Sequence, residues 1–211
     1  IISSSVEHAS TNDCLKELER QSWEITRLPV SSEGCIDIQD LENAITSKTS
    51  LIALMAVNNE TGAENDIDAI AEIATKHEIP LFIDAVALMG KKRIKIPAGV
   101  SALCFSGHKM HGPKGIGVLY VKPQFRFRSL VTGGGQEYGR RGGTENIIGI
   151  IAIAKAVELL EENQEAYSKH MLELRDLFEK SLTEKVPSIH INGKGSRVCN
   201  TSNVSFDDVE G

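Results

Sequence analysis

Residues 103–117 gather side chains that could do chemistry. A hydroxyl, an imidazole and an amine, from Ser106, His108 and Lys109, follow directly on a short apolar run. The run at 102–105 is too short for a helix and predicts a buried strand, and the glycines and proline at 112–117 predict a loop. A lysine just past such a strand lies where open α/β sheets bind ligands. Taken alone, such a segment more often marks an ordinary solvent-exposed lysine.

Three other predicted strands also end in polar groups. His8 follows a strand at 1–6, Asn58 and Asn59 follow the apolar run 51–57, and Asp84 lies within the apolar run 81–86. A lone histidine is commonly structural, and two asparagines before a glycine are typical of a turn. Asp84 is different, because a carboxylate in a buried strand is costly unless it is paired. The sequence therefore predicts a cationic partner for Asp84.

A pyridinium nitrogen would be such a partner, and a lysine amine at the next strand end would suit an aldehyde on the same ring. This combination of a lysine Schiff base with an aspartate on the ring nitrogen is the logic of pyridoxal phosphate sites. A metal site built on His108 and His111 is disfavoured, because the neighbouring sequence offers no third ligand. We therefore predict a cofactor site at Lys109 and Asp84 and no metal.

Strands and helices alternate at short spacing through the first two-thirds of the chain. Apolar runs without alternation, such as 51–57, are typical of parallel strands covered on both faces. The pattern predicts an α/β fold with a mostly parallel sheet and helices on both faces. Residues 118–121 follow the preceding strand too closely for a helical crossover, so we expect an antiparallel neighbour there. Ser10 or Thr11 is expected to cap the helix after His8.

Long helical patterns follow, at 147–162 and at 164–182. Residues 189–194 are expected to form a strand that enters a turn, and 201–206 another strand. We predict that residues 1–164 form part of a large domain, and that 165–211 form a linking helix and the beginning of a small α+β domain. The chain opens on a strand already under way and stops soon after another strand. It is therefore expected to be a fragment.

Composition excludes several classes of protein. The net charge of −6 argues against general attraction to nucleic acid or to anionic lipid. No apolar run approaches the length of a membrane span. The four cysteines show no CxxC spacing, which argues against a zinc site or a disulfide framework and favours a reducing, cytoplasmic location.

Seven segments in consistent order resemble the cysteine desulfurases of the NifS/IscS type, which are class V members of the aminotransferase superfamily. The resemblance implies the type I pyridoxal phosphate fold, here as an incomplete large domain, and it covers the whole chain. The segments are VEH at 6–8, NNETG at 58–62, IDAV at 83–86, SGHK at 106–109, GPKGIGVLYV at 112–121, GGGQE at 133–137 and RGGTEN at 141–146.

The resemblance assigns roles to four strand-end residues. Lys109 would be the lysine that forms the Schiff base with pyridoxal 5′-phosphate, and Asp84 would pair with the pyridine nitrogen. His8 would stack on the ring and assist proton transfers. Asn59 resembles the asparagine that contacts the ring hydroxyl or orients the substrate.

Three further residues would bind the cofactor phosphate. Ser106 and His108 resemble phosphate ligands within one subunit. Thr144 resembles a threonine that reaches the phosphate of the other subunit, which implies a homodimer with shared sites. One position departs from the family, since Ala87 stands where a glutamine usually bonds the ring hydroxyl.

The implied reaction removes sulfur from L-cysteine to give L-alanine and an enzyme persulfide. The persulfide would serve iron–sulfur cluster or thio-cofactor assembly through a sulfur-acceptor or scaffold protein. The family's N-terminal phosphate-binding turn and its nucleophilic cysteine loop have no counterpart in this sequence, and none of the four cysteines lies in that loop context. The chain alone is therefore expected to be inactive. Three alternatives stay open: a selenocysteine lyase, another class V aminotransferase or lyase, and a degenerate non-catalytic fragment of the same fold.

Overall fold

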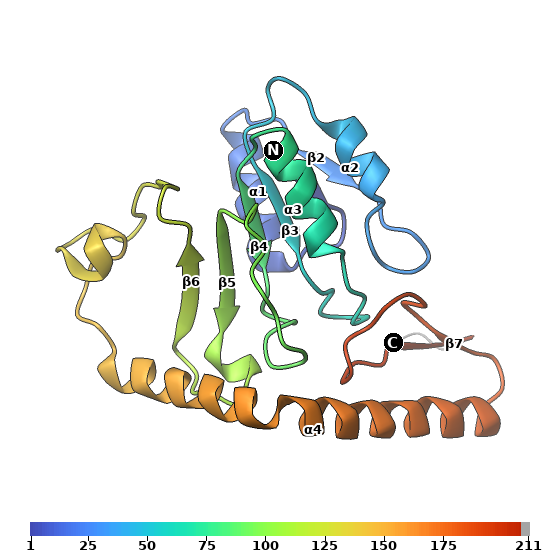
Figure 1. Ribbon diagram of the computed structural model, residues 1–211. Helices are drawn as coiled ribbons and strands as arrows, with labels where there is room; N and C mark the ends of the chain where they lie inside the picture. Colours follow the sequence, from blue (N-terminus) through green and yellow to red (C-terminus); the bar gives the residue numbers. More distant parts are fainter. Residues whose placement is uncertain (208–211) are drawn as a thin grey trace.

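A computed structural model describes residues 1–207, and its main feature is a six-stranded sheet (Figure 1). The strand order is β2-β1-β3-β4-β5-β6, with the first five strands parallel and β6 antiparallel to β5. The predicted mostly parallel sheet and its antiparallel neighbour are confirmed. The strands are β1 (Ile2–Ser4), β2 (Thr26–Leu28), β3 (Ile52–Met55), β4 (Leu81–Asp84), β5 (Ala102–Ser106) and β6 (Gly117–Val121).

Helices α1 (Ala9–Arg20), α2 (Ile38–Ala44) and α3 (Ile67–Lys76) connect the parallel strands. The predicted caps of α1 are wrong, because His8 is the N-cap residue and the helix has already begun before Ser10. The imidazole nitrogen accepts a hydrogen bond from a first-turn N–H, which is the task that a serine or threonine oxygen usually performs.

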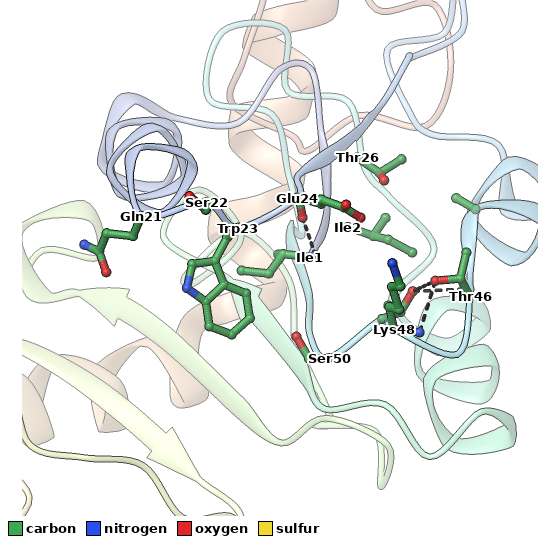
Figure 2. A pocket seen from close by; sticks show the side chains of 12 residues that line it. Ile1, Ile2, Gln21, Ser22, Trp23, Glu24, Thr26, Thr46, Lys48 and Ser50 are labelled. Carbon is green, nitrogen blue, oxygen red and sulfur yellow. Dashed lines mark hydrogen bonds between the residues drawn. The ribbon is translucent and has the colours of Figure 1, made fainter.

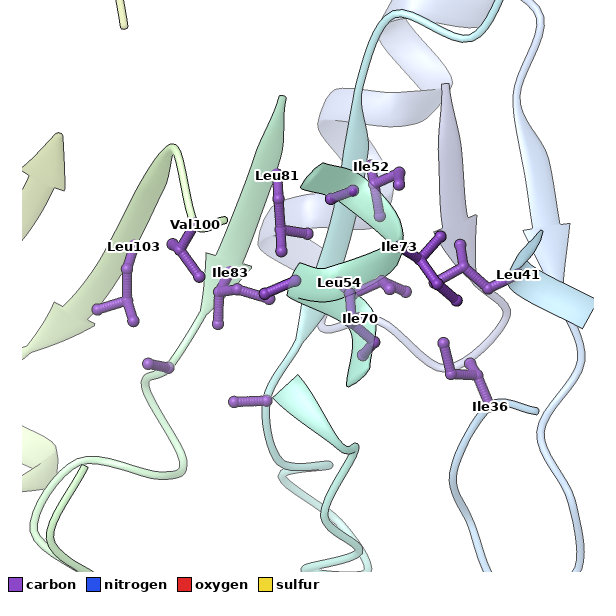
Figure 3. Close-up of a cluster of buried hydrophobic side chains, with 14 of the residues drawn as sticks. Ile36, Leu41, Ile52, Leu54, Ile70, Ile73, Leu81, Ile83, Val100 and Leu103 are labelled. Carbon is purple, nitrogen blue, oxygen red and sulfur yellow. The ribbon is translucent and has the colours of Figure 1, made fainter. Parts of the chain in front are cut away.

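The main hydrophobic core lies between α2, α3 and one face of the sheet (Figure 3). Alternate residues of β3 and β4 point to this face, as the two-residue period of a strand requires. Helix α1 lies behind the sheet in Figures 1 and 3, which confirms helices on both faces. The core includes Ile52, Leu54, Leu81 and Ile83 of the sheet with Leu41, Ile70 and Ile73 of the helices.

Helix α4 (Ile147–Lys185) is a single helix of 39 residues. The predicted break between residues 162 and 164 is wrong, because no glycine or proline interrupts residues 150–185 and the polar side chains there do not end the helix. In Figure 1, α4 runs along the bottom, from the outer side of β6, past β6 and β5, to the side of β7.

Two short antiparallel strands, β7 (Ile189–Ile191) and β8 (Val204–Phe206), follow α4 as predicted. The division into two domains at residue 164 stays a prediction. The last residues of the predicted second domain, 208–211, lie outside the described residues. Within residues 1–207, no helix combines the length and apolar character needed to cross a membrane.

Candidate active site

Four neighbouring parallel strands, β1, β3, β4 and β5, end at the same edge of the sheet, which faces the bottom of Figure 1. Asp84 is the last residue of β4 and Ser106 the last of β5, while His8 and Asn59 follow β1 and β3. Asp84 pairs in register with Met55 of β3 and with Cys104 of β5. The topology therefore delivers the predicted strand-end groups to one edge.

Asp84 is a buried carboxylate, with 8% of its surface exposed. Its Oδ1 accepts a hydrogen bond from the Val86 N–H at 2.9 Å. None of the ion pairs formed by residues 1–207 involves Asp84. A buried carboxylate without an ion-pair partner is costly unless a cation binds beside it. The protonated ring nitrogen of pyridoxal phosphate is a suitable cation.

Lys109 ends the 3-10 turn η1 (Gly107–Lys109), which follows β5 directly. Its side chain is exposed, and its Nζ takes part in none of the hydrogen bonds described for residues 1–207. The turn is tight, because a Cβ on Gly107 would lie 3.0 Å from the carbonyl oxygen of Pro113. Glycine is therefore needed at the position that turns the chain from the strand to the lysine.

Ser106 and His108 flank that glycine. Ser106 is half-buried and His108 is exposed. A hydroxyl and an imidazole, together with backbone N–H groups of a turn, are suitable donors for a phosphate. The donor set beside Lys109 thus fits the phosphate of the cofactor.

The imidazole of His8 has a defined tautomer. Its Nδ1 accepts a hydrogen bond from the Ser10 N–H at 3.2 Å and lies 2.8 Å from Ser10 Oγ. Because Nδ1 is occupied as an acceptor, the neutral ring carries its proton on Nε2. The side chain is exposed, so Nε2–H is available as a donor.

The two asparagines after β3 differ in their surroundings. Asn58 is buried, and its Oδ1 accepts hydrogen bonds from the Glu60 and Thr61 N–H groups at 3.0 and 2.9 Å. Asn59 is exposed, and within residues 1–207 its amide donates only to the adjacent Glu60 carboxylate, at 2.7 Å. Asn58 therefore shapes the loop, and Asn59 is the asparagine whose amide can meet a ligand.

Glu7 is a buried acid at this edge that the sequence reasoning missed, with 5% of its surface exposed. Its Oε1 accepts hydrogen bonds from Ser4 Oγ at 2.7 Å and from the Met55 N–H at 3.0 Å. Its Oε2 is buried without a partner among residues 1–207. Burial raises the pKa of the Glu7 carboxyl, and the nearby charge of Asp84 raises it further. Its position directly after a strand end was the available signal.

The cysteine nearest to Asp84 is unsuited to nucleophilic chemistry. Burial, together with the negative charge of Asp84, raises the pKa of the Cys104 thiol to about 11. A thiol of this kind is protonated and unreactive near neutral pH.

Thr144 is exposed just before α4, and no hydrogen bond described for residues 1–207 joins its side chain to the other predicted residues. Within those same residues, no cluster of three His, Cys, Asp or Glu side chains is arranged to hold a metal ion.

A hollow of about 400 Å³ lies at the opposite edge of the sheet (Figure 2). Residues at the beginning of β1 and before β2 line it, including Ile1 and Trp23, together with Thr46 and Lys48 from the loop before β3. It is therefore separate from the edge that carries Asp84 and Lys109.

The order of the strands and the lysine and aspartate at their carboxyl ends define the class: this is the type I fold of pyridoxal-phosphate-dependent enzymes. Two solved structures share it. A NifS-like protein superposes with a TM-score of 0.93 at 33% identity, over 99% of this chain and 57% of that chain. A structure of SspA in complex with cysteine gives a TM-score of 0.85 at 34% identity, over 98% of this chain and 58% of that one.

The chain belongs to the class-V aminotransferase family, whose profile it matches over residues 1–211. Cysteine desulfurase 2 of Trichormus variabilis is 41% identical over 213 residues, and so is a cysteine desulfurase of Klebsiella pneumoniae. Both alignments cover 100% of this chain and 53% of the relative, so the chain spans about half the length of the curated relatives it matches. Enzymes of this family depend on pyridoxal 5′-phosphate, as the resemblance implied.

Proposed function

We propose that this chain acts in a pyridoxal-phosphate-dependent cysteine desulfurase. The observation that carries the proposal is the buried Asp84 carboxylate on β4, which has no ion-pair partner among residues 1–207, one strand from the exposed Lys109 amine after β5. An acid and an amine at neighbouring strand ends match the two ends of a pyridoxal ring. The cysteine desulfurases that align with the whole chain support this choice of reaction.

Lys109 would hold the cofactor covalently through its Nζ, and Asp84 would keep the ring nitrogen protonated. Ser106 and His108 would donate to the phosphate, and the exposed amide of Asn59 would meet the ring hydroxyl or the substrate. When bound, the cofactor supplies an electron sink for a carbanion at the substrate α-carbon.

Proton transfers would fall to two side chains. The Lys109 Nζ would take the proton from the substrate α-carbon. His8 presents its proton on Nε2 and is anchored through Nδ1, so it can donate without first reorienting. Both groups follow parallel strands: Lys109 ends the turn η1 after β5, and His8 caps α1 after β1.

The net reaction would convert L-cysteine and a protein thiol into L-alanine and a protein persulfide. The carbon–sulfur bond of the substrate breaks, and a sulfur–sulfur bond forms at the protein thiol. Cys104 is not that thiol, because its pKa of about 11 keeps it protonated. A sulfur-acceptor or scaffold protein would receive the sulfur, for iron–sulfur cluster or thio-cofactor assembly.

Borohydride trapping tests the cofactor site directly. The protein is incubated with pyridoxal 5′-phosphate and reduced, and the modified peptide is identified by mass spectrometry. The label is expected on Lys109 and is expected to disappear in Lys109→Ala. Lys114→Ala, an exposed lysine of the same loop, is the matched control and should keep the label. A label that persists in Lys109→Ala would refute the assignment.

Substrate trials separate the alternatives. Alanine formed from L-cysteine supports a desulfurase, alanine formed only from L-selenocysteine supports a selenocysteine lyase, and amino transfer to an oxo acid supports an aminotransferase. A protein that retains no cofactor would support the degenerate fragment. These trials include a reductant and a thiol acceptor, so that a missing nucleophilic cysteine does not by itself abolish alanine formation.

A homodimer with shared sites is part of the proposal. Thr144 would reach the phosphate of the partner subunit. Exposed isoleucines at the start of α4, directly after Thr144, support an interface there: Ile147, Ile148 and Ile151. Sedimentation equilibrium tests it, and Ile148→Asp should shift the protein towards the monomer. The free cysteines of the described residues are in keeping with a cytoplasmic location.

A further inference from the structure

The loop between β4 and β5 makes a direct contact with the backbone of Lys109. The Lys91 Nζ donates a hydrogen bond to the carbonyl oxygen of Lys109 at 3.2 Å. That carbonyl is the last one of the turn η1, and carbonyls at the end of a helical turn have no partner within it. The Lys91 side chain therefore caps the turn from which the Lys109 side chain emerges.

The backbone of Lys91 is itself held by α4. The hydroxyl of Ser168 donates to the Lys91 carbonyl oxygen at 2.6 Å. The buried amide of Gln164 donates to the Gly90 carbonyl oxygen at 3.2 Å and to Ser168 Oγ at 2.7 Å. The Cys199 thiol, from the segment after β7, approaches the same Lys91 carbonyl at 3.6 Å. The segment 90–91 is thus fixed by polar contacts with α4 and with Cys199.

Close packing accompanies these hydrogen bonds. Gly90 has a φ of +76°, and a Cβ there would lie 3.1 Å from Leu160 Cδ1 and 3.3 Å from Met110 Cβ. Met110 directly follows Lys109 and is fully buried. Because Gly90 has no side chain, both Leu160 of α4 and Met110 can pack against this position of the loop.

The electrostatics agree with this geometry. Burial lowers the pKa of the Lys91 amine, the charge of Cys199 opposes that change, and the positive charge of Lys109 adds to it. The two lysine amines are therefore near enough to interact, with Lys91 on the buried side and Lys109 on the exposed side.

We propose that Lys91 is a positioning residue for Lys109: it transmits the position of α4, through Ser168 and Gln164, to the turn that presents the Lys109 amine. This role rests on the proposed function, since it is Lys109 that would hold the cofactor. The contact itself belongs to the cofactor-free protein and can be measured there.

Hydrogen exchange of residues 107–112 is the primary test, made on the protein without cofactor. Lys91→Met keeps most of the aliphatic stem but removes the donor, and it is expected to raise exchange in this peptide by about tenfold, the effect of one hydrogen bond from a charged group. Lys91→Arg keeps a donor and should restore protection. Ser168→Ala, which leaves the Lys91 amine in place, should have a smaller effect.

Cofactor retention is the second readout. After loading and gel filtration, Lys91→Met should retain about tenfold less borohydride-trapped cofactor on Lys109 than the wild type at limiting cofactor, and Lys91→Arg should retain nearly as much. Unchanged exchange in Lys91→Met, no rescue by Lys91→Arg, or no effect of Ser168→Ala would each overturn the inference. If Lys91→Met does not fold, Lys91→Gln, whose amide is too short to reach, takes its place.

The two proposals fail in different ways. A wild-type protein that traps no cofactor contradicts the proposed function, whereas normal trapping with no difference between Lys91→Met and the wild type contradicts only the positioning role.

Discussion

Replacing Glu7 by glutamine should make the protein more stable at alkaline pH than the wild type. The Glu7 carboxyl is 5% exposed, and its Oε2 is buried without a partner among residues 1–207. Burial and the charge of Asp84 raise its pKa above the ordinary value. Glutamine has nearly the same shape, keeps an oxygen to accept from Ser4 and Met55, and carries no charge at any pH.

The sign of the pH dependence follows from proton linkage. Between the ordinary pKa and the raised pKa, the folded protein holds a proton on Glu7 that the unfolded chain has released. The free energy of unfolding therefore falls as the pH rises through this window. The contribution of Glu7 is fully present below its ordinary pKa and is lost as the pH rises through the folded-state value.

The size of the effect is that of leaving a buried polar or charged group without its partner, about 1–3 kcal/mol. We expect the difference in unfolding free energy between Glu7→Gln and the wild type to grow by this amount between pH 4 and pH 8. Any constant cost of burying the amide cancels in that comparison. Urea unfolding followed by circular dichroism at several pH values measures it.

Glu72→Gln, at an exposed position of α3, is the matched control and should show no such growth. A difference between Glu7→Gln and the wild type that stays constant from pH 4 to pH 8 would refute the assignment of a raised pKa to Glu7.

Two further predictions concern a thiol and the core. At pH 8, iodoacetamide should alkylate Cys104, with its pKa of about 11, on the order of 100-fold more slowly than the exposed Cys14, as measured by peptide mass spectrometry; equal rates would contradict the burial argument. Leu81→Ala, at a fully buried position, should lower the free energy of unfolding by about 2–5 kcal/mol. Leu130→Ala, 97% exposed, should change it by less than about 0.5 kcal/mol, and a similar loss in both would contradict the assignment of the core.

The sheet could be predicted because its signals are local. The run 51–57 and the run 81–86 are apolar on both faces, which only covered parallel strands require, and the short link to residues 118–121 leaves no room for a crossover. The shared location of the strand-end residues could also be predicted, because the carboxyl ends of parallel strands lie at one edge of the sheet. Asp84 could be identified because an acid within an apolar strand is unusual.

The position of Glu7 after the predicted strand 1–6 did not single it out, and Lys91 carried no comparable signal. Glu7 lies beside His8 in a polar stretch, and Lys91 begins the basic run of 91–93, so each is typical of a surface residue in sequence. Their roles depend on contacts with residues far along the chain: Glu7 with Met55, and Lys91 with Lys109 and Ser168. Local periodicity carries no information about such contacts.

Glu7 and Asp84 are two buried acids at the same edge of the sheet, and the charge of one affects the other. If Glu7 and Asp84 were both ionised, their charges would repel within a region shielded from water. Raising the pKa of Glu7 favours its neutral form and lessens that repulsion. Glu7 would then serve the cofactor site without touching the cofactor, and its instability at high pH would be the cost of placing a second carboxyl there. Cofactor retention by the wild type should therefore fall, relative to that of Glu7→Gln, as the pH rises through the folded-state pKa of Glu7.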